Sequence, residues 1–87
     1  MEILLDGKQV INKQILFLTL KEQINSNEFY GDNLDALWDV LSSTEEEIFV
    51  TILHQEDLNN NLGEYAELLI ELFHDLKDVN DKVCLKF

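Results

Sequence analysis

Residues 48–53 read IFVTIL and form the clearest predicted strand of this chain. β-Branched residues dominate the segment, as is usual in strands. A nearly continuous apolar run is typical of a parallel strand that is covered on both faces. Shorter apolar runs at residues 3–5 and 83–87 predict two further strands, one near each end of the chain. We therefore expect a small sheet in which residues 48–53 are buried on both sides.

Helical patterns fill the chain between the predicted strands. Asn12 can cap the first helix, and Asp32 or Asn33 can cap the second. The last helix places apolar residues at steps of three and four, with acidic residues on another face. The predicted helices span residues 13–25, 34–43, 55–60 and 62–79, of which the third is short and weak. Strands separated by helices predict an α/β fold, with a three-stranded parallel sheet and about four helices in one layered domain over residues 1–87.

Charge is the strongest global property of the chain. The sequence has 18 acidic and 6 basic residues, a formal net charge of −12. Nucleic acids and anionic membranes are poor partners for such a protein, because both are bound through Lys and Arg. A cationic protein is the favoured partner, although acidity that serves only solubility explains the same balance.

The ends and the single cysteine suggest a cytoplasmic protein. The first residues, MEILLDG, lack the basic segment of a signal peptide, and no apolar run is long enough to span a membrane. Cys84 has no second cysteine to pair with, and we expect it to be buried in the last strand. We therefore expect a reducing, cytoplasmic environment.

The segment 29–39, FYGDNLDALWD, is the best candidate for function. Asp35 and Asp39 lie four residues apart on one helical face, bordered by Trp38, and no Lys or Arg occurs between Lys21 and Lys77. Such a like-charge pair costs an isolated helix a few tenths of a kcal/mol. Asp35 can offset this by complementing the helix dipole, but Asp39 lies too far along the helix. The pair suggests a surface for a partner's cations, although a solvated helix face with Trp38 in the core remains an alternative.

Catalytic and metal-binding patterns are absent from the sequence. His54 and His74 lie twenty residues apart, and no HxxxH or CxxC spacing suggests zinc. The segment 32–35 has calcium-like ligands but lacks the glycine and closing glutamate of a calcium loop. Acid–base catalysis by Asp35 and Asp39 would need a concave pocket. We expect no catalytic residue, no metal and no cofactor.

Residues 30–39, YGDNLDALWD, closely resemble the signature of the barstar family, intracellular inhibitors of the bacterial ribonuclease barnase. The similarity extends from Ile3 through residues 6–9 and 19–21 to the terminal strand. It implies a three-stranded parallel sheet packed with helices, and no enzymatic activity. Members of the family block the nuclease active site with the second helix and the loop before it.

The resemblance also implies roles for individual residues. Asp39 matches the central anchor that occupies the phosphate site of the nuclease, and Asp35 matches a second ion-pairing acid. Phe29 replaces a Tyr, Ser42 a Thr, Thr44 a Trp, and Asp75 a Glu. The implied partner-binding residues are Phe29, Tyr30, Gly31, Asn33, Asp35, Trp38, Asp39, Ser42, Thr44 and Asp75.

We therefore expect an inhibitor of a basic, extracellular-type ribonuclease resembling barnase, acting in toxin immunity and monomeric when free. Helix 33–43 and the preceding loop would block the active site. Thr44 stands where the family has a Trp. This difference leaves open an alternative, in which the chain is a module of the same fold that neutralises a different basic protein or toxin.

Overall fold

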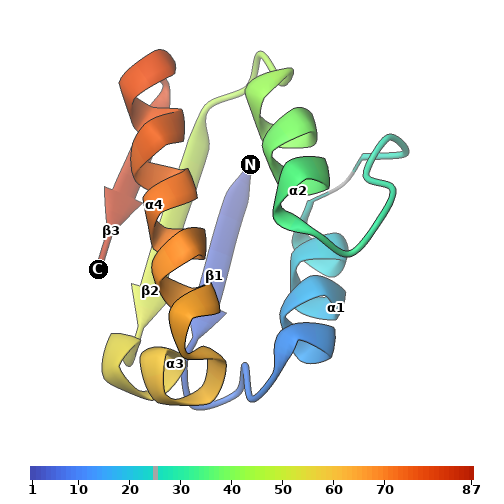
Figure 1. Ribbon diagram of the computed structural model, residues 1–87. Coiled ribbons are helices and arrows are strands. Elements are labelled where there is room, and N and C mark those ends of the chain that lie inside the picture. Colours follow the sequence, from blue (N-terminus) through green and yellow to red (C-terminus); the bar gives the residue numbers. More distant parts are fainter. Residues whose placement is uncertain (25) are drawn as a thin grey trace.

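Figure 1 shows the computed structural model, which describes residues 1–24 and 26–87. Its strands form one parallel sheet in the order β1-β2-β3, and the described residues contain four helices. The predicted α/β class is confirmed. The elements in chain order are β1 (Glu2–Asp6), α1 (Lys13–Gln23), α2 (Leu34–Ser42), β2 (Ile48–Leu53), α3 (Gln55–Leu62), α4 (Glu64–Val79) and β3 (Val83–Lys86).

The helices α1, α2 and α4 lie on the same face of the sheet, and α3 lies beyond the end of β2 (Figure 1). The sheet residues that face the three helices are almost completely buried, and they join the apolar stripes of the helices in one core. These inward-facing strand residues are Ile3, Leu5, Ile48, Val50, Ile52 and Val83.

The prediction that residues 48–53 are buried on both faces was wrong. The burial of β2 alternates, so Phe49 and Leu53 are 42% and 43% exposed, while Ile48 and Ile52 are buried. Leu4 of β1 is exposed in the same way. The reason is that α1, α2 and α4 pack on one side of the sheet, which leaves every second strand residue facing away from the core.

Cys84 was also predicted incorrectly as buried. It is exposed, because its neighbours Val83 and Leu85 are the residues of β3 that face the core. The prediction of one helix over residues 62–79 was inaccurate at its start. Gly63, with a φ of 61°, separates α3 from α4, and α4 begins at Glu64.

The predicted N-terminal cap of the first helix is found in the structure. The side chain of Asn12 accepts a hydrogen bond from the backbone N–H of Ile15 at 2.9 Å, as predicted for the start of α1. The predicted end of this helix, residue 25, lies outside the described residues, and α1 ends at Gln23. No helix in the described part of the chain is both long and apolar enough to cross a membrane.

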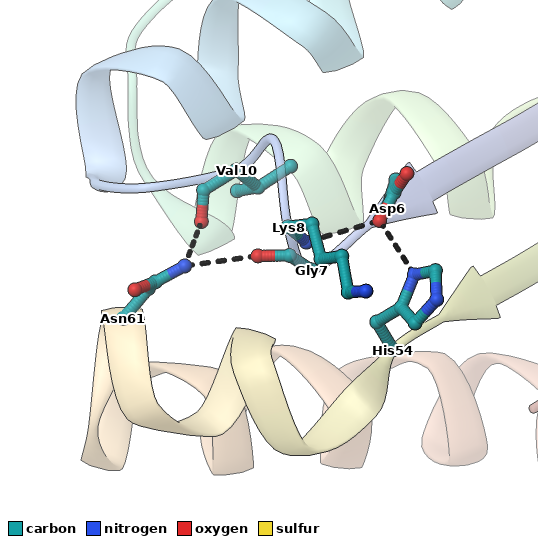
Figure 2. Close-up of polar contacts among 6 residues, drawn as sticks. All are labelled: Asp6, Gly7, Lys8, Val10, His54 and Asn61. Carbon is teal, nitrogen blue, oxygen red and sulfur yellow. Dashed lines mark hydrogen bonds and ion pairs between the residues drawn. The ribbon is translucent and has the colours of Figure 1, made fainter.

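A polar network joins the turn after β1 to α3 (Figure 2). Nδ1 of His54 lies 2.9 Å from a carboxylate oxygen of Asp6, which also accepts a hydrogen bond from the backbone N–H of Lys8. The side-chain amide of Asn61 donates to the backbone oxygens of Gly7 and Val10. The turn and α3 are therefore held together at the end of the sheet opposite the chain's first residue.

Gly7 allows the closest backbone approach in this network. A Cβ atom at Gly7 would lie 2.0 Å from the carbonyl oxygen of His54 and 2.6 Å from the backbone nitrogen of Leu58. Neither atom belongs to a movable side chain, so the turn and the start of α3 would have to separate. Only glycine fits this position without such a shift.

We predict that Gly7→Ala lowers the free energy of unfolding by about 3 kcal/mol, because its methyl group overlaps backbone atoms. Urea denaturation monitored by circular dichroism measures the change. Gly63→Ala is the matched control, since a Cβ there meets no atom within 4 Å and only the positive φ is unfavourable. We expect the control to cost about 1–2 kcal/mol. Equal losses would contradict the close-approach argument.

We also predict that Asp6 contributes less to the stability of the fold at acidic pH. The hydrogen bond with His54, followed by that with Lys8, lowers the pKa of Asp6 from its ordinary value of 3.8. A carboxylate whose pKa is lowered by folding stabilises the fold fully at pH values above its pKa in the unfolded chain. This stabilisation disappears as the pH falls through its pKa in the folded protein. The stability difference between the wild type and Asp6→Asn should therefore shrink between about pH 5 and about pH 3. Urea unfolding of both proteins across this range measures it, and a constant difference would contradict the prediction.

Candidate partner-binding site

The loop before α2 is held at its C-terminal end. Lys21 of α1 forms an ion pair with Asp32 at 2.5 Å. Gly31 has a φ of 87°, a conformation that suits glycine, and Asn33 then begins α2. The side chain of Asn33 accepts a hydrogen bond from the backbone N–H of Ala36 at 2.8 Å. Of the two caps considered from the sequence, Asn33 is therefore the one used.

The apolar stripe of α2 determines which of its residues face solvent. Leu37, Val40 and Leu41 are buried against the rest of the core. Asp35 and Asp39, on the opposite side of the helix, are exposed. Within residues 1–24 and 26–87 the acid–base contacts are the ion pair Lys21–Asp32 and the hydrogen bond between His54 and Asp6, so neither Asp35 nor Asp39 has an internal cation as a partner.

The backbone around Asp39 is well held although its carboxylate is exposed. The hydroxyl of Ser43 donates to the carbonyl oxygen of Asp39 at 2.7 Å. Ser42, a predicted contact residue, is exposed and makes a longer hydrogen bond of 3.5 Å to the same oxygen. The side chain of Asp39 thus projects from an ordered last turn of α2, with the Ser42 hydroxyl only weakly engaged.

A groove of about 310 Å³ separates α2 from α4. Its apolar part includes the half-buried indole of Trp38 and the 51% exposed side chain of Leu68. Three carboxylates line the same groove: Asp35 from α2, and Glu71 and Asp75 from α4. The fold therefore brings Asp75 beside Asp35 and Trp38, although about forty residues separate Asp75 from them in the sequence.

Glu71 and Leu68 are groove residues that the sequence reasoning did not select. Glu71 is one of the acidic residues that the sequence places on the polar face of the last helix. A signal was available, because Glu71 precedes Asp75 by four residues and so shares its helical face. Leu68 is not among the apolar positions that recur at steps of three and four in the last helix, so its place outside the core was a signal in the sequence.

Thr44 lies in a second, smaller hollow beyond the end of α2. The hollow has a volume of about 160 Å³, and Thr44 shares it with Ser43 and the acidic residues Glu28 and Glu46. The hydroxyl oxygen of Thr44 accepts a hydrogen bond from the backbone N–H of Glu46 at 3.3 Å. The small side chain at position 44 thus leaves open space beside the candidate site.

Two neighbouring aromatic residues of the loop have different environments. The side chain of Tyr30 is 76% exposed, so it is available for contact. The ring of Phe29 is 8% exposed and belongs to the core, with the ammonium group of Lys21 5.4 Å from its centroid. The side chain of Phe29 therefore anchors the loop in the free protein rather than presenting a contact surface.

The groove has the chemistry of a cation-binding surface without the features of a metal centre. In the part of the chain that the structure describes, no three His, Cys, Asp or Glu residues are grouped closely enough to hold a metal ion. Carboxylates beside a half-buried indole can instead receive an extended cationic side chain, with the cation against the ring and its hydrogen bonds to the acids.

Comparison with known proteins identifies the family. The family model for Barstar (barnase inhibitor) matches residues 1–87. The chain belongs to the barstar family. A relative from Bacillus subtilis (strain 168), described as "Putative ribonuclease inhibitor YrdF", is 31% identical over 78 residues, which cover 88% of this chain and 86% of the relative.

Membership of the barstar family agrees with the fold. Barstar-family proteins are inhibitors rather than enzymes, and the family implies a ribonuclease as the partner. The acidic, cation-free surface of α2 lies in the segment that carried the resemblance, residues 30–39.

We predict that Asn33→Ala lowers the free energy of unfolding by about 1 kcal/mol, because the first turn of α2 loses its side-chain cap. Thermal and urea denaturation measure the loss. Asn60→Ala, an exposed change within α3, is the control and should be neutral or slightly stabilising because alanine favours helix. If Asn33→Ala is as stable as the control, the observed cap contributes nothing to the folded protein.

Proposed function

We propose that this protein inhibits a barnase-type ribonuclease by placing α2 and the loop before it in the nuclease active site. The observation that carries the proposal is the exposed pair Asp35 and Asp39, which has no cationic partner within the described residues and borders a groove lined by further acids. Family membership supports a ribonuclease as the target.

In the proposed complex, Asp39 acts as the anchor. An enzyme that cleaves RNA must hold a phosphate with cationic side chains, and a carboxylate can occupy the same place. Asp39 is suited to this role because its helix is packed on the core and its carbonyl oxygen is held by Ser43. Little conformational freedom of the helix would be lost on binding, so more of the interaction energy would appear as affinity.

The groove between α2 and α4 would receive a second cationic side chain of the nuclease. An Arg or Lys lying against Trp38 could reach Asp35 on one wall and Asp75 on the other. Glu71 adds a negative charge beside the same position. Desolvation by the surrounding nuclease would strengthen each of these ion pairs relative to water.

The remaining predicted contact residues surround this centre. Tyr30 and Gly31, in the loop, would contact the nuclease. The hydroxyl of Ser42, which makes only a long hydrogen bond in the free protein, would contact it beyond Asp39. Asn33 would contribute at the first turn, where it also caps the helix. Phe29 supports the loop from within the core, and Thr44 opens a hollow that a larger side chain of the partner could fill.

We further propose that the chain has no enzymatic activity, needs no cofactor, and acts in the cytoplasm as a single domain over residues 1–87. One hydrophobic cluster includes residues from every strand and helix, which supports a single unit. The alternative target, another basic protein or toxin, is favoured by the hollow at Thr44. This hollow would accommodate a surface different from that of barnase itself.

We predict that Asp39→Ala weakens inhibition of barnase while the free energy of unfolding changes by less than about 0.5 kcal/mol. The expected loss of binding energy is about 2–5 kcal/mol, as for truncation of one member of a buried charge pair, a scale that derives in part from barnase and barstar themselves. Titration of barnase activity on an RNA substrate measures inhibition, and urea denaturation measures stability.

Glu56→Ala provides the matched control, because it removes the same charge from an exposed position on α3, outside α2 and the groove. It should leave inhibition within about twofold of the wild type. Equal losses from both variants would indicate a general charge effect and remove the anchor role. No inhibition of barnase by the wild type, together with specific capture of another basic protein, would favour the alternative target.

A further inference from the structure

The side of the sheet away from the helices is a separate surface that the proposed inhibitor site does not use. In the described part of the chain, the helices that cover the sheet all lie on its other side (Figure 1). We call this surface the free face. Its residues alternate with those of the core, and they are Glu2, Leu4, Asp6, Phe49, Thr51, Leu53, Cys84 and Lys86.

Three large apolar side chains on the free face are exposed by nearly half. Leu4 is 47% exposed, Phe49 42% and Leu53 43%. Strand register places Leu4 beside Thr51, and Leu53 beside Asp6, so the three side chains come from adjoining positions of β1 and β2. Contiguous exposed apolar surface of this kind is typical of an interaction site.

The edges of the sheet are protected, in contrast with the free face. The side chain of Gln23 pairs with β1 as another strand would, accepting from the backbone N–H of Leu4 at 2.6 Å and donating to its carbonyl oxygen at 2.8 Å. At the opposite edge, β3 carries Lys86 and is preceded by Lys82. A satisfied backbone and lysine side chains both discourage pairing at an edge. Association through the face is therefore more favourable than extension of the sheet.

We propose that a second copy of this chain docks on the free face, with the two sheets stacked about a twofold axis parallel to β2. Such an axis places β1 of each copy over β3 of the other, because β2 is the central strand. Phe49 and Thr51 lie on β2 and meet their own counterparts near the axis. The contact is self-complementary, as an interface between identical chains requires.

Charge supports a second copy as the occupant. The outward strand residues include two acids, Glu2 and Asp6, and one base, Lys86, so the face has a net charge of −1 in a chain of −12. An acidic copy therefore meets less repulsion here than the average charge of the chain implies. In register, Leu4 aligns with Thr51 and Lys86, so the half-turn places Lys86 of one copy over Leu4 of the other, between the acidic residues Glu2 and Asp6 on the same strand.

The proposed dimer is weak and strengthened by salt. Three short strands offer less area than the roughly 800 Å² per partner of a stable complex, so we expect a dissociation constant on the order of 100 µM. Each copy has a net charge of −12, and salt screens the repulsion between them. Binding to a basic ribonuclease has the opposite salt dependence, which separates the two interactions experimentally.

Sedimentation equilibrium of the full chain up to about 1 mM, at about 0.05 M and 0.5 M NaCl, tests the proposal. The wild type should form more dimer at the higher salt concentration. Phe49→Lys should raise the dissociation constant at least about tenfold, because it places two like charges at the axis. Leu18→Lys, at a 52% exposed position on α1, is the matched control and should behave as the wild type.

Charge reversal tests the orientation. Glu2→Lys and Lys86→Glu should each weaken the dimer, and the double variant should restore it at least partly. A wild type that stays monomeric at 1 mM and high salt would overturn the proposal, as would equal effects of Phe49→Lys and Leu18→Lys. Failure of the double variant to recover would overturn the proposed axis. Phe49→Lys should inhibit barnase as the wild type does, so a failed dimer and a failed inhibitor give different results.

Discussion

Packing of the buried stripe of α2 is the interaction on which the candidate site depends. Leu37, Val40 and Leu41 are buried in the core, which fixes the rotation of the helix about its own axis. This rotation leaves Asp35 and Asp39 facing solvent. The cap at Asn33 and the ion pair between Lys21 and Asp32 fix where the helix begins. The position of the acidic surface is thus a consequence of apolar packing.

The charge arrangement is unfavourable for the isolated protein and informative for that reason. Asp35 and Asp39 repel one another across a turn, and Glu71 and Asp75 line the same groove without a cationic partner among the described residues. Where a sequence departs from what local stability favours, a functional explanation is the first to consider. A partner that supplies cations would relieve this repulsion. Membership of the barstar family gives that partner a chemical class, a ribonuclease.

The two sides of the sheet have different physical properties. The helical side presents α2, α4 and their acidic groove, whereas the free face is apolar and nearly neutral. Screening by salt would therefore weaken the proposed contact of the first surface with cations and strengthen the proposed contact of the second with another acidic copy. Because the surfaces lie on opposite sides of the sheet, occupation of one leaves the other accessible. The two proposed interactions would therefore use different surfaces, one for a cationic partner and the other for a second copy of the chain.

The amino-acid sequence determined the elements, the cap at Asn12 and the acidic face of α2, because each depends on residues only a few positions apart. For α2 it limited the cap to Asp32 or Asn33, and the structure shows Asn33. The family was also recognisable from residues 30–39. Only the tertiary structure decided that the sheet is covered on one side, so that Phe49 and Cys84 are exposed. It also decided that Phe29 is buried and that Glu71 and Leu68 join the groove. The physical reason is that periodicity reports which residues share a face, whereas burial of that face depends on where distant segments pack.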